Sequence, residues 1–153
     1  MRIMIRATAI AVIGVSILVV AQAHTSASVA ERQLFVAVNR ARHAQGLPEL
    51  RWDEALTTAA RRHAGLMAQH AAAEHGFAGE PSLASRVTQM GARFVWLAEN
   101  VAQGPGVEAI HEEFLRSPNH RANILDSDMD SIGVGVADRG GQLFAVEDFS
   151  RAK

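Results

Sequence analysis

The sequence predicts an α+β fold in which helices pack around a small, mainly antiparallel sheet. Helical spacing of apolar residues dominates the chain from residue 31 to about residue 91. An extended apolar segment follows at residues 94–101, and two alternating segments close the chain at residues 132–149. Helices first, a hairpin last and an extended segment between them predict layers of helix against a sheet.

The first two helices follow from apolar stripes with clear ends. Residues 31–45 carry apolar side chains at helical spacing, and Gly46 ends that helix. Asp53 has the side chain of a helix N-cap, and a stripe from residue 56 to residue 71 predicts a second helix behind it. His63 and His70 fall on or near this stripe, where we expect hydrogen-bonded core or boundary histidines.

Shorter helices follow from serine caps and one apolar pattern. Ser82 caps a short third helix that Gly91 ends, and residues 107–115 form the fourth. Ser117-Pro118 is a capping hydroxyl followed by a proline in the first turn, which is typical of a helix start. His120 therefore falls in the first turn of a fifth helix.

The last segment has the pattern of a β-hairpin. Ile132, Val134 and Val136 alternate with Gly133 and Gly135, so one face of this strand is smooth and another segment can approach it closely. A glycine turn at residues 138–141 leads to the second strand at residues 143–149.

The N-terminus has the three parts of a secretory signal peptide at residues 1–23: a basic start, an apolar run from Ala7 to Val20 and a small-residue exit at Ala21-Gln22-Ala23. These 14 apolar residues rise only about 21 Å as a helix, short of a bilayer core of roughly 30 Å. We expect a signal peptide at 1–23, a short polar leader at 24–30 and one domain at 31–153, secreted or periplasmic and soluble after cleavage.

Charge and cysteine content exclude some functions. The chain has no cysteine, so a thiol nucleophile is impossible and the exported domain stands without disulfides. Without residues 1–23 it carries 13 basic and 16 acidic residues, a net charge near −3. We expect no nucleic-acid partner, because neutralisation of phosphates supplies most of that affinity.

Several catalytic and metal-binding motifs are matched only in part by this sequence. His111 starts an HExxH pattern, but Leu115 stands where the second metal-binding histidine is needed. Residues 126–130 begin like a calcium loop, but Ser131 and Ala137 replace its glycine and its bidentate glutamate. There is no G-x-S-x-G elbow and no phosphate-binding glycine loop.

The remaining candidates for chemistry are histidines and one glutamate. His24 and His43 look like surface residues, whereas His75, Glu99 and His120 sit at element ends or in irregular backbone, where functional side chains are usually presented. Two imidazoles and a carboxylate that converge would suit a divalent metal with an open position, or general acid/base work. Periodicity alone does not show that they converge.

Ordered motifs give the chain a resemblance to a known family. Ala-Glu-Asn-Val-Ala at 98–102, Ser-Pro-Asn-His-Arg-Ala-Asn-Ile-Leu at 117–125 and Ile-Gly-Val-Gly-Val-Ala at 132–137 occur in that order. The chain resembles the bacterial branch of the CAP superfamily, which comprises cysteine-rich secretory, antigen 5 and pathogenesis-related proteins, also called SCP-like extracellular proteins. The likeness runs from about Glu31 to Phe149. Matches to its opening helices are Asn39-Arg40, Gly46-Leu47, residues 50–53, His63-Ala64 and Met67-Ala68.

The resemblance implies an α-β-α sandwich with a central cleft. It assigns His75 and His120 as the two cleft histidines and Glu99 as their acidic partner. A second acid, present in many eukaryotic members, would fall at Ser117 and is absent here, although Glu113 could substitute from the preceding turn. The resemblance therefore implies a cleft for a divalent metal such as zinc at His75 and His120, or for a small ligand.

Simple electrostatics gives each cleft residue an expected behaviour. Near a helix start capped by Ser117, His120 should be less basic and favour its neutral, metal-binding form. Glu99 should stabilise an imidazolium, or serve as a ligand or a base that orients water. The alternative is a purely structural cluster that pins the sheet to the helices.

Three further polar residues are expected to hold the cleft in one shape. Asn100 and Asn123 should satisfy backbone groups in irregular segments, and Arg121 should pair with a carboxylate such as Asp148.

The leading functional hypothesis is an exported, non-enzymatic binding module whose partner is a small molecule, a lipid, or an envelope or host component. The alternative, from another class, is a metal-dependent hydrolase that resembles a protease and uses Glu99 as its base. A third is a structural envelope protein with no ligand. For a lipid, the sequence shows no large exposed apolar helix.

Overall fold

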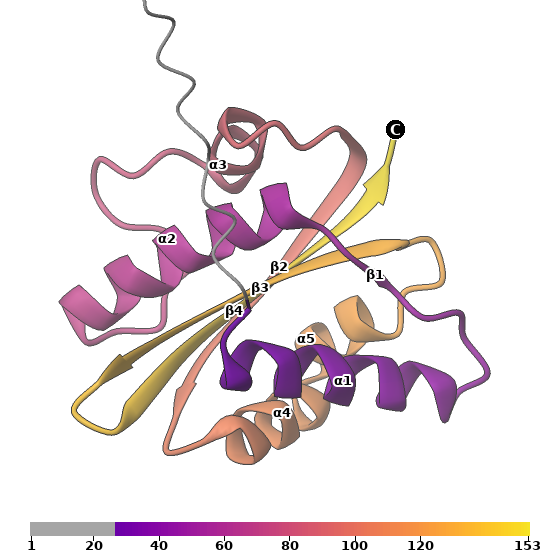
Figure 1. Ribbon diagram of the computed structural model, residues 1–153, viewed down its shortest axis with the longest axis horizontal. Helices are drawn as coiled ribbons and strands as arrows, with labels where there is room; N and C mark the ends of the chain where they lie inside the picture. The colour runs from indigo at the N-terminus through magenta and orange to yellow at the C-terminus, as the bar shows by residue number, and fades with distance from the viewer. Residues whose placement is uncertain (1–26) are drawn as a thin grey trace, which may run out of the picture.

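A computed structural model describes residues 27–153, and these residues form the predicted α+β fold (Figure 1). The five helices and four strands of the described residues are α1 (Val29–His43), β1 (Arg51–Trp52), α2 (Glu54–His70), α3 (Leu83–Gln89), β2 (Phe94–Gly104), α4 (Val107–Arg116), α5 (Pro118–Ile124), β3 (Ser131–Arg139) and β4 (Gln142–Ala152). The predicted signal peptide at 1–23 lies outside them. Among the described residues, no helix is long and apolar enough to cross a membrane.

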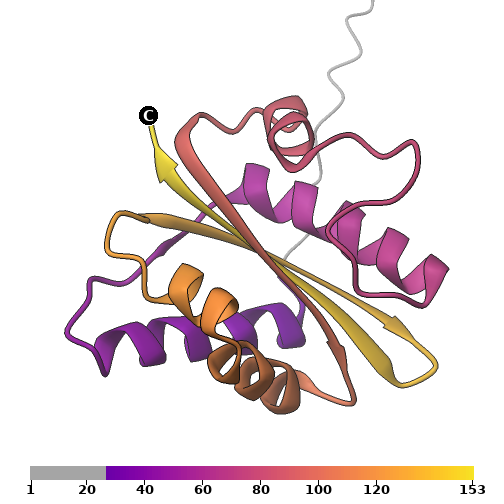
Figure 2. The same ribbon diagram turned by 180° about the vertical axis from the view of Figure 1, so that it is seen from behind.

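The four strands form one mixed sheet in the order β1-β3-β4-β2. The hairpin β3–β4 and the pair β2–β4 are antiparallel, while the two-residue strand β1 pairs with β3 in parallel. Helices α2 and α3 lie on one side of this sheet and α1, α4 and α5 on the other, as both ribbon views show (Figures 1 and 2). β2 is therefore an edge strand with helices on both sides.

The register of the strands decides which side chains share a face. Glu99 of β2 lies opposite Asp148 of β4, which lies opposite Gly133 of β3, so this row faces α2 and α3. In the next row, Asn100 lies opposite Glu147, and this row faces α1, α4 and α5. Neighbouring side chains of one strand therefore pack on opposite faces of the sheet, in two different cores.

The smooth face of β3 is the point where α2 approaches the sheet. A Cβ atom added at Gly133 would lie 2.2 Å from the backbone nitrogen of Thr57, and one at Gly135 would lie 2.3 Å from the backbone of α2. The sequence prediction of a closely approached strand is confirmed, and the second helix is the segment that approaches it.

The first helix begins earlier than the sequence predicts. The side chain of Ser28 accepts a hydrogen bond from the amide of Glu31, whose carboxylate accepts one from the amide of Ser28, which together form a capping box. Residues 29 and 30 therefore belong to α1 and not to the polar leader. β2 is also longer than predicted and continues to Gly104.

Candidate functional site

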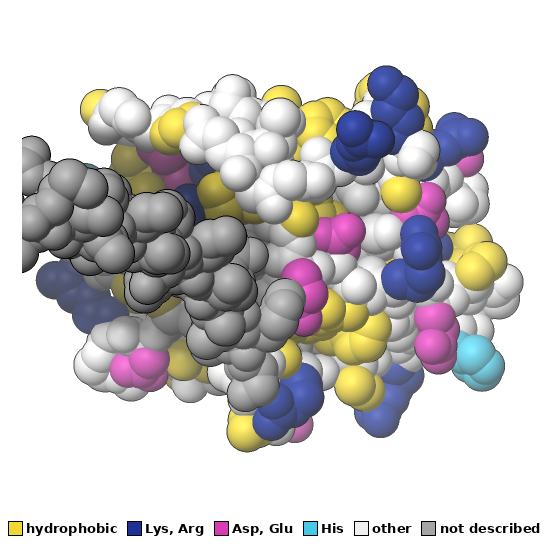
Figure 3. Space-filling view, turned by 45° about the horizontal axis from the view of Figure 1, so that its top comes forward, with side chains coloured by type: hydrophobic (Ala, Val, Ile, Leu, Met, Phe, Trp, Pro, Cys, Tyr) yellow, Lys and Arg dark blue, Asp and Glu magenta, His cyan; other side chains and the backbone are white. Residues whose placement is uncertain are grey.

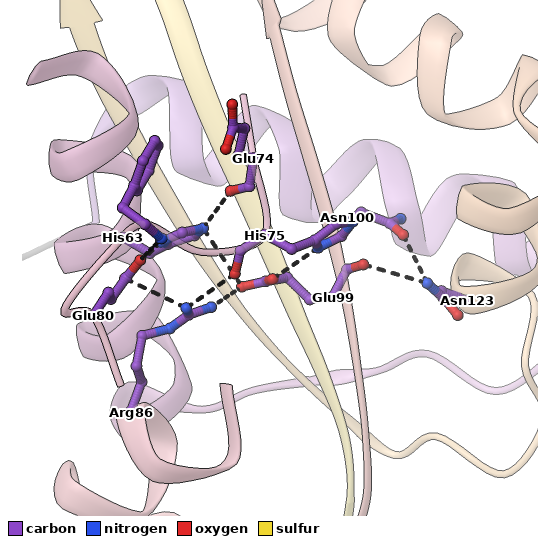
Figure 4. A network of polar contacts seen from close by, with 9 residues as sticks. His63, Glu74, His75, Glu80, Arg86, Glu99, Asn100 and Asn123 are labelled. Atoms are coloured by element: carbon purple, nitrogen blue, oxygen red, sulfur yellow. Dashed lines mark hydrogen bonds and ion pairs between the residues drawn. The ribbon is translucent and has the colours of Figure 1, made fainter. Parts of the chain in front are cut away.

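The candidate cleft lies along the edge strand β2, where two consecutive side chains turn to opposite sides of the sheet. Glu99 faces α2, α3 and the segment between them, and Asn100 faces α5. Figure 4 shows the resulting chain of polar contacts, from His63 and Glu80 through Glu99 to Asn100 and Asn123.

His75 is held by Glu99 at the surface of the molecule. Its Nδ1 atom lies 2.9 Å from Oε1 of Glu99; the His75 side chain is 61% exposed and that of Glu99 only 4%. The hydrogen bond to Glu99 raises the pKa of His75, against a smaller opposing effect of burial. Because Glu99 engages Nδ1, the Nε2 atom of His75 is the one left for a ligand.

Behind His75 lies a group of four buried, ionisable side chains that we call the buried quartet: His63, Glu80, Arg86 and Glu99. Nδ1 of His63 lies 2.7 Å from Glu80, and Arg86 contacts Glu80 at 3.3 Å. Arg86 also donates to the second carboxylate oxygen of Glu99. Both oxygens of Glu99 are therefore engaged, one by His75 and one by Arg86.

The buried quartet also fixes the irregular segment that carries His75. Nε2 of His63 lies 2.8 Å from the carbonyl oxygen of Glu74, and Arg86 donates to the carbonyl oxygen of His75 at 3.2 Å. Glu80 accepts a hydrogen bond from the amide of Phe77 at 3.1 Å. The 71–82 segment lacks helix and strand, so these contacts hold its shape.

On the opposite side of the sheet, two asparagines tie α5 to β2. Nδ2 of Asn100 donates to the carbonyl oxygen of His120 at 3.2 Å and to Glu147 at 3.1 Å. Asn123 donates to the side-chain oxygen of Asn100 at 2.9 Å and lies 3.5 Å from the carbonyl oxygen of Glu99. The prediction that both asparagines satisfy backbone groups is confirmed.

His120 is half-buried in the first turn of α5, edge-on to the ring of Phe114 with 5.2 Å between the ring centres. Ser117 caps this helix and accepts from the amide of His120. Burial lowers the pKa of His120, and the charge of His75 lowers it further, while Glu113 acts in the opposite direction. The predicted direction of the shift is confirmed, but its main cause is burial.

The charge of His75 is one of the causes that lower the pKa of His120. One imidazole is held by a carboxylate and the other is kept neutral by burial. Within residues 27–153, no three or more His, Cys, Asp or Glu side chains are grouped to hold one metal ion.

Two neighbouring acids of β4 are fully buried and point to opposite sides of the sheet. Burial raises the pKa of Glu147 to about 8, and the hydrogen bond from Asn100 only partly offsets this. Burial and then the charge of Glu99 raise the pKa of Asp148 well above its ordinary value. Glu147 is therefore a carboxylic acid at neutral pH, and burial favours the neutral form of Asp148 as well.

The predicted pair between Arg121 and Asp148 is wrong. Arg121 is exposed on α5, whereas Asp148 is buried on the other side of the sheet, and neither of its oxygens has a hydrogen-bond partner in the structure. The two elements flank different faces, which a sequence without strand register does not reveal.

The predictions for His63 and His43 are confirmed, and that for His24 lies outside the described residues. His63 is fully buried and hydrogen-bonded, and His43 is exposed, whereas His70, expected as a hydrogen-bonded core or boundary residue, is exposed and stacked on Phe77. The role of His63 in the site was not predicted. Sequence reasoning did not bring His63, Glu80 and Arg86 to the site. For His63 and Arg86 the available signal was a polar residue among the apolar positions of α2 and α3, whereas Glu80 lies in the 71–82 segment, which has no such pattern.

A four-stranded mixed sheet with helices on both faces defines the class of α+β protein to which the described residues belong. The family model of CAP, the cysteine-rich secretory protein family, matches residues 35–149, and the chain belongs to that family. This is the family that the motifs at residues 98–102, 117–125 and 132–137 predict.

Individual relatives agree with this membership. YkwD of Bacillus subtilis is 29% identical over 119 residues, which are 77% of this chain and 46% of YkwD. An extracellular protein containing an SCP domain from Bacillus anthracis has a TM-score of 0.74 and 28% identity, over 80% of this chain and 40% of its own. The chain thus spans less than half of these two relatives.

A third similarity concerns the fold alone. An outer surface protein from Borrelia burgdorferi has a TM-score of 0.74 at 21% identity, and the match covers 81% of this chain and 93% of that one. The α+β architecture of the described residues is thus that of the CAP family.

Proposed function

We propose that this protein is an exported, non-enzymatic binding module whose cleft takes a divalent metal ion such as zinc through His75 and His120. The observation that carries the proposal is the contact between Glu99 and Nδ1 of His75. A carboxylate bound to one ring nitrogen fixes the tautomer and turns the other nitrogen outward, as it does in many metal sites. Imidazole is a ligand that suits zinc.

The proposed donor set leaves part of the coordination sphere of the ion open. His120 supplies a second imidazole that burial keeps neutral, which is the form that binds metal. Two protein ligands are fewer than the three typical of catalytic zinc sites, so the ion would keep open positions for water or a small ligand. An ion bound there would supply a positive charge that can take up an anionic or carbonyl group.

The contacts of Glu99 favour binding over hydrolysis. A hydrolase that uses this cleft needs a carboxylate free to accept a proton from water. Both oxygens of Glu99 are engaged, by His75 and Arg86, and the residue is 8% exposed. The hydrolase remains the alternative, and peptide-hydrolysis assays with and without chelator test it: turnover that a chelator abolishes would replace the binding module by an enzyme.

Export is part of the proposal and draws on two observations. The first 23 residues have the pattern of a signal peptide. Two similar proteins are described as extracellular and as an outer surface protein. The face drawn in Figure 3 carries basic and acidic side chains next to each other, with hydrophobic side chains between them, so the described part of this face forms no single-sign field.

Zinc titration by calorimetry tests the metal site. Protein lacking residues 1–23 should bind zinc with an affinity of about 1 µM or tighter, and the double variant His75→Ala/His120→Ala should lose this binding. His43→Ala is a matched control, because His43 is an exposed histidine on α1 away from the cleft. Equal binding by wild type and double variant would refute the metal site.

A groove between α1 and α4 supports a second candidate function, the binding of an acyl chain. The groove has a volume of about 940 Å³, and Val29 and Val36 on its α1 side are 63% and 53% exposed. Further lining residues include Val107 and Leu115. The groove forms only where α1 and α4 meet. No single helix of the sequence therefore shows the apolar surface that a lipid would need.

Mass spectrometry of the native protein tests this second function. Co-purified lipid that is lost in Ala37→Trp, which fills the groove, would support it. The same variant should keep its zinc affinity, because Ala37 lies on α1, away from the two histidines. Native protein free of lipid, with no uptake of a fatty acid added at micromolar concentration, would rule it out.

A further inference from the structure

The hydrogen bonds of His63 require more protons than a neutral imidazole can supply. Nε2 lies 2.8 Å from the carbonyl oxygen of Glu74, which can only accept, so Nε2 carries a proton. Nδ1 lies 2.7 Å from a carboxylate oxygen of Glu80. If the ring were neutral, Nδ1 would carry no proton. Its lone pair would then face the lone pairs of the carboxylate at hydrogen-bond distance, with no proton between them.

One proton must therefore lie between His63 and Glu80, and two arrangements place it there. Either His63 is an imidazolium facing a carboxylate, or a neutral His63 accepts from a protonated Glu80. The other contacts of Glu80 distinguish these arrangements, because the amide of Phe77 donates to one of its oxygens and Arg86 lies 3.3 Å from the other. A carboxyl with two such donors is held in its ionised form.

Among the remaining neighbours of His63, Glu99 favours an imidazolium and Arg86 opposes it. Glu99 on β2 lies 4.0 Å from Nε2, close enough for its charge to favour an imidazolium. The cation Arg86 on α3 is shared between Glu80 and Glu99. On β4, burial and the charge of Glu99 raise the pKa of Asp148, which favours the neutral form of this group. The buried quartet then holds two cations and two anions.

We infer that His63 is a buried imidazolium and a positioning residue of the cleft. It holds the carbonyl oxygen of Glu74, while Arg86 holds that of His75, the next residue. A helical residue that has no exposed surface thus determines where the exposed cleft histidine stands. The role in positioning rests on the proposed function, whereas the protonation state does not.

Nitrogen NMR of the histidine rings in the folded wild-type protein tests the protonation state directly. At pH 7.5 both ring nitrogens of His63 should carry the resonances of protonated nitrogens. A bare Nδ1 would show that the proton belongs to Glu80 and would overturn the inference. This measurement needs no zinc and no variant, so its result is independent of the metal site.

Substitutions at the buried quartet test the positioning role. His63→Gln should weaken zinc binding by about 10-fold or more, as loss of an outer partner of a ligand does. Combining it with Glu80→Gln removes both charges of the pair, so the double variant should recover part of the loss in either single variant. His70→Gln is the matched control on the same helix, because His70 stacks on Phe77 but is exposed.

The outcomes separate the inference from the proposed function. A folded His63→Gln protein that binds zinc like wild type would refute the positioning role while leaving the metal site intact. A wild type that binds no zinc would refute the metal site, and the NMR measurement would then decide the inference by itself.

Discussion

The two faces of the sheet bury charge in different ways. On the side of α2 and α3, acids meet cations: Arg86 contacts both Glu80 and Glu99. On the side of α1, α4 and α5, Glu147 lies among apolar residues with Asn100 as its hydrogen-bond partner, and burial raises its pKa to about 8. Ion pairs stabilise the charges of Glu80 and Glu99 on one face, although burial and the charge of Glu99 raise the pKa of Asp148 there. On the other face, burial keeps Glu147 neutral.

A buried cation on the second face follows a third route. The guanidinium of Arg42 is fully buried and donates to the carbonyl oxygens of Pro48, Ile124, Asp126 and Met129. It joins α1 to the segment before β3 without a hydrogen bond to a carboxylate among the described residues. Carbonyl dipoles can satisfy a buried cation, whereas a buried carboxylate needs a donor for each oxygen.

The largest expected effect comes from the contact between β3 and α2, on the charged face. Gly133→Val should destabilise the protein by about 4 kcal/mol or more, because its Cβ would lie 2.2 Å from the backbone of α2 and neither element can yield locally. Chemical denaturation monitored by circular dichroism measures the change. We expect a protein that is largely unfolded or fails to accumulate.

Gly65→Ala in α2, the helix that approaches Gly133, provides the matched control. A Cβ at Gly65 has open space around it, so alanine should stabilise α2 by about 0.5–1 kcal/mol. If Gly133→Val were tolerated as well as Gly65→Ala, the close approach of α2 to the sheet would be disproved.

Breaking the buried quartet should have the next largest effect. Arg86→Leu removes the cation and leaves Glu80 and Glu99 buried without it, which costs about 3–5 kcal/mol in comparable buried pairs. Urea denaturation at neutral pH measures the loss. Arg116→Leu, an exposed arginine at the end of α4, should change stability by less than about 0.5 kcal/mol. A loss below about 1 kcal/mol for Arg86→Leu would contradict a charge-paired face.

Glu147→Gln should have a smaller effect that depends on pH. The folded-state pKa of Glu147 is about 8, against an ordinary 4.5, so its contribution to stability is complete below pH 4.5 and is lost as pH rises through about 8. At about 1.4 kcal/mol per unit, wild type should lose roughly 2 kcal/mol relative to Glu147→Gln between about pH 6 and pH 7.5. Parallel pH dependences of the two melting temperatures would show that Glu147 is ionised in the fold.

The same two faces explain which parts of the fold could be predicted from the sequence. Capping serines such as Ser82 and Ser117 act locally, so the helices that they start were placed correctly. The glycine pattern of β3 is also a local signal, and it predicts correctly that another segment approaches this strand closely. β1 escaped prediction because two residues are too short to show an alternating pattern.

The candidate cleft was harder to predict because it depends on register and on segments with no periodicity. His75, Glu99 and His120 are proposed from motifs, but the contact between Glu99 and Arg86 comes from a helix pattern in which Arg86 resembles a solvent-exposed residue. Alternation also expects Glu147 or Asp148 to point to solvent. Both are buried, because β4 lies inside the sheet and helices cover both of its faces.

The smallest expected effect concerns the two cleft histidines, since solvent reaches both rings and screens their charges. His75, beside Glu99, should titrate above the ordinary histidine pKa, and His120 should titrate below it. Ring NMR across about pH 5 to pH 8 follows both groups. Glu113→Gln should lower the pKa of His120 further and leave that of His75 in place, because Glu113 acts on His120. Equal titration of both rings in the wild type would mean that the contact with Glu99 does not set His75 apart. In the proposed site, a metal ion bound by both rings would displace a proton mainly from His75. Zinc affinity should therefore fall as pH drops through the pKa of that residue.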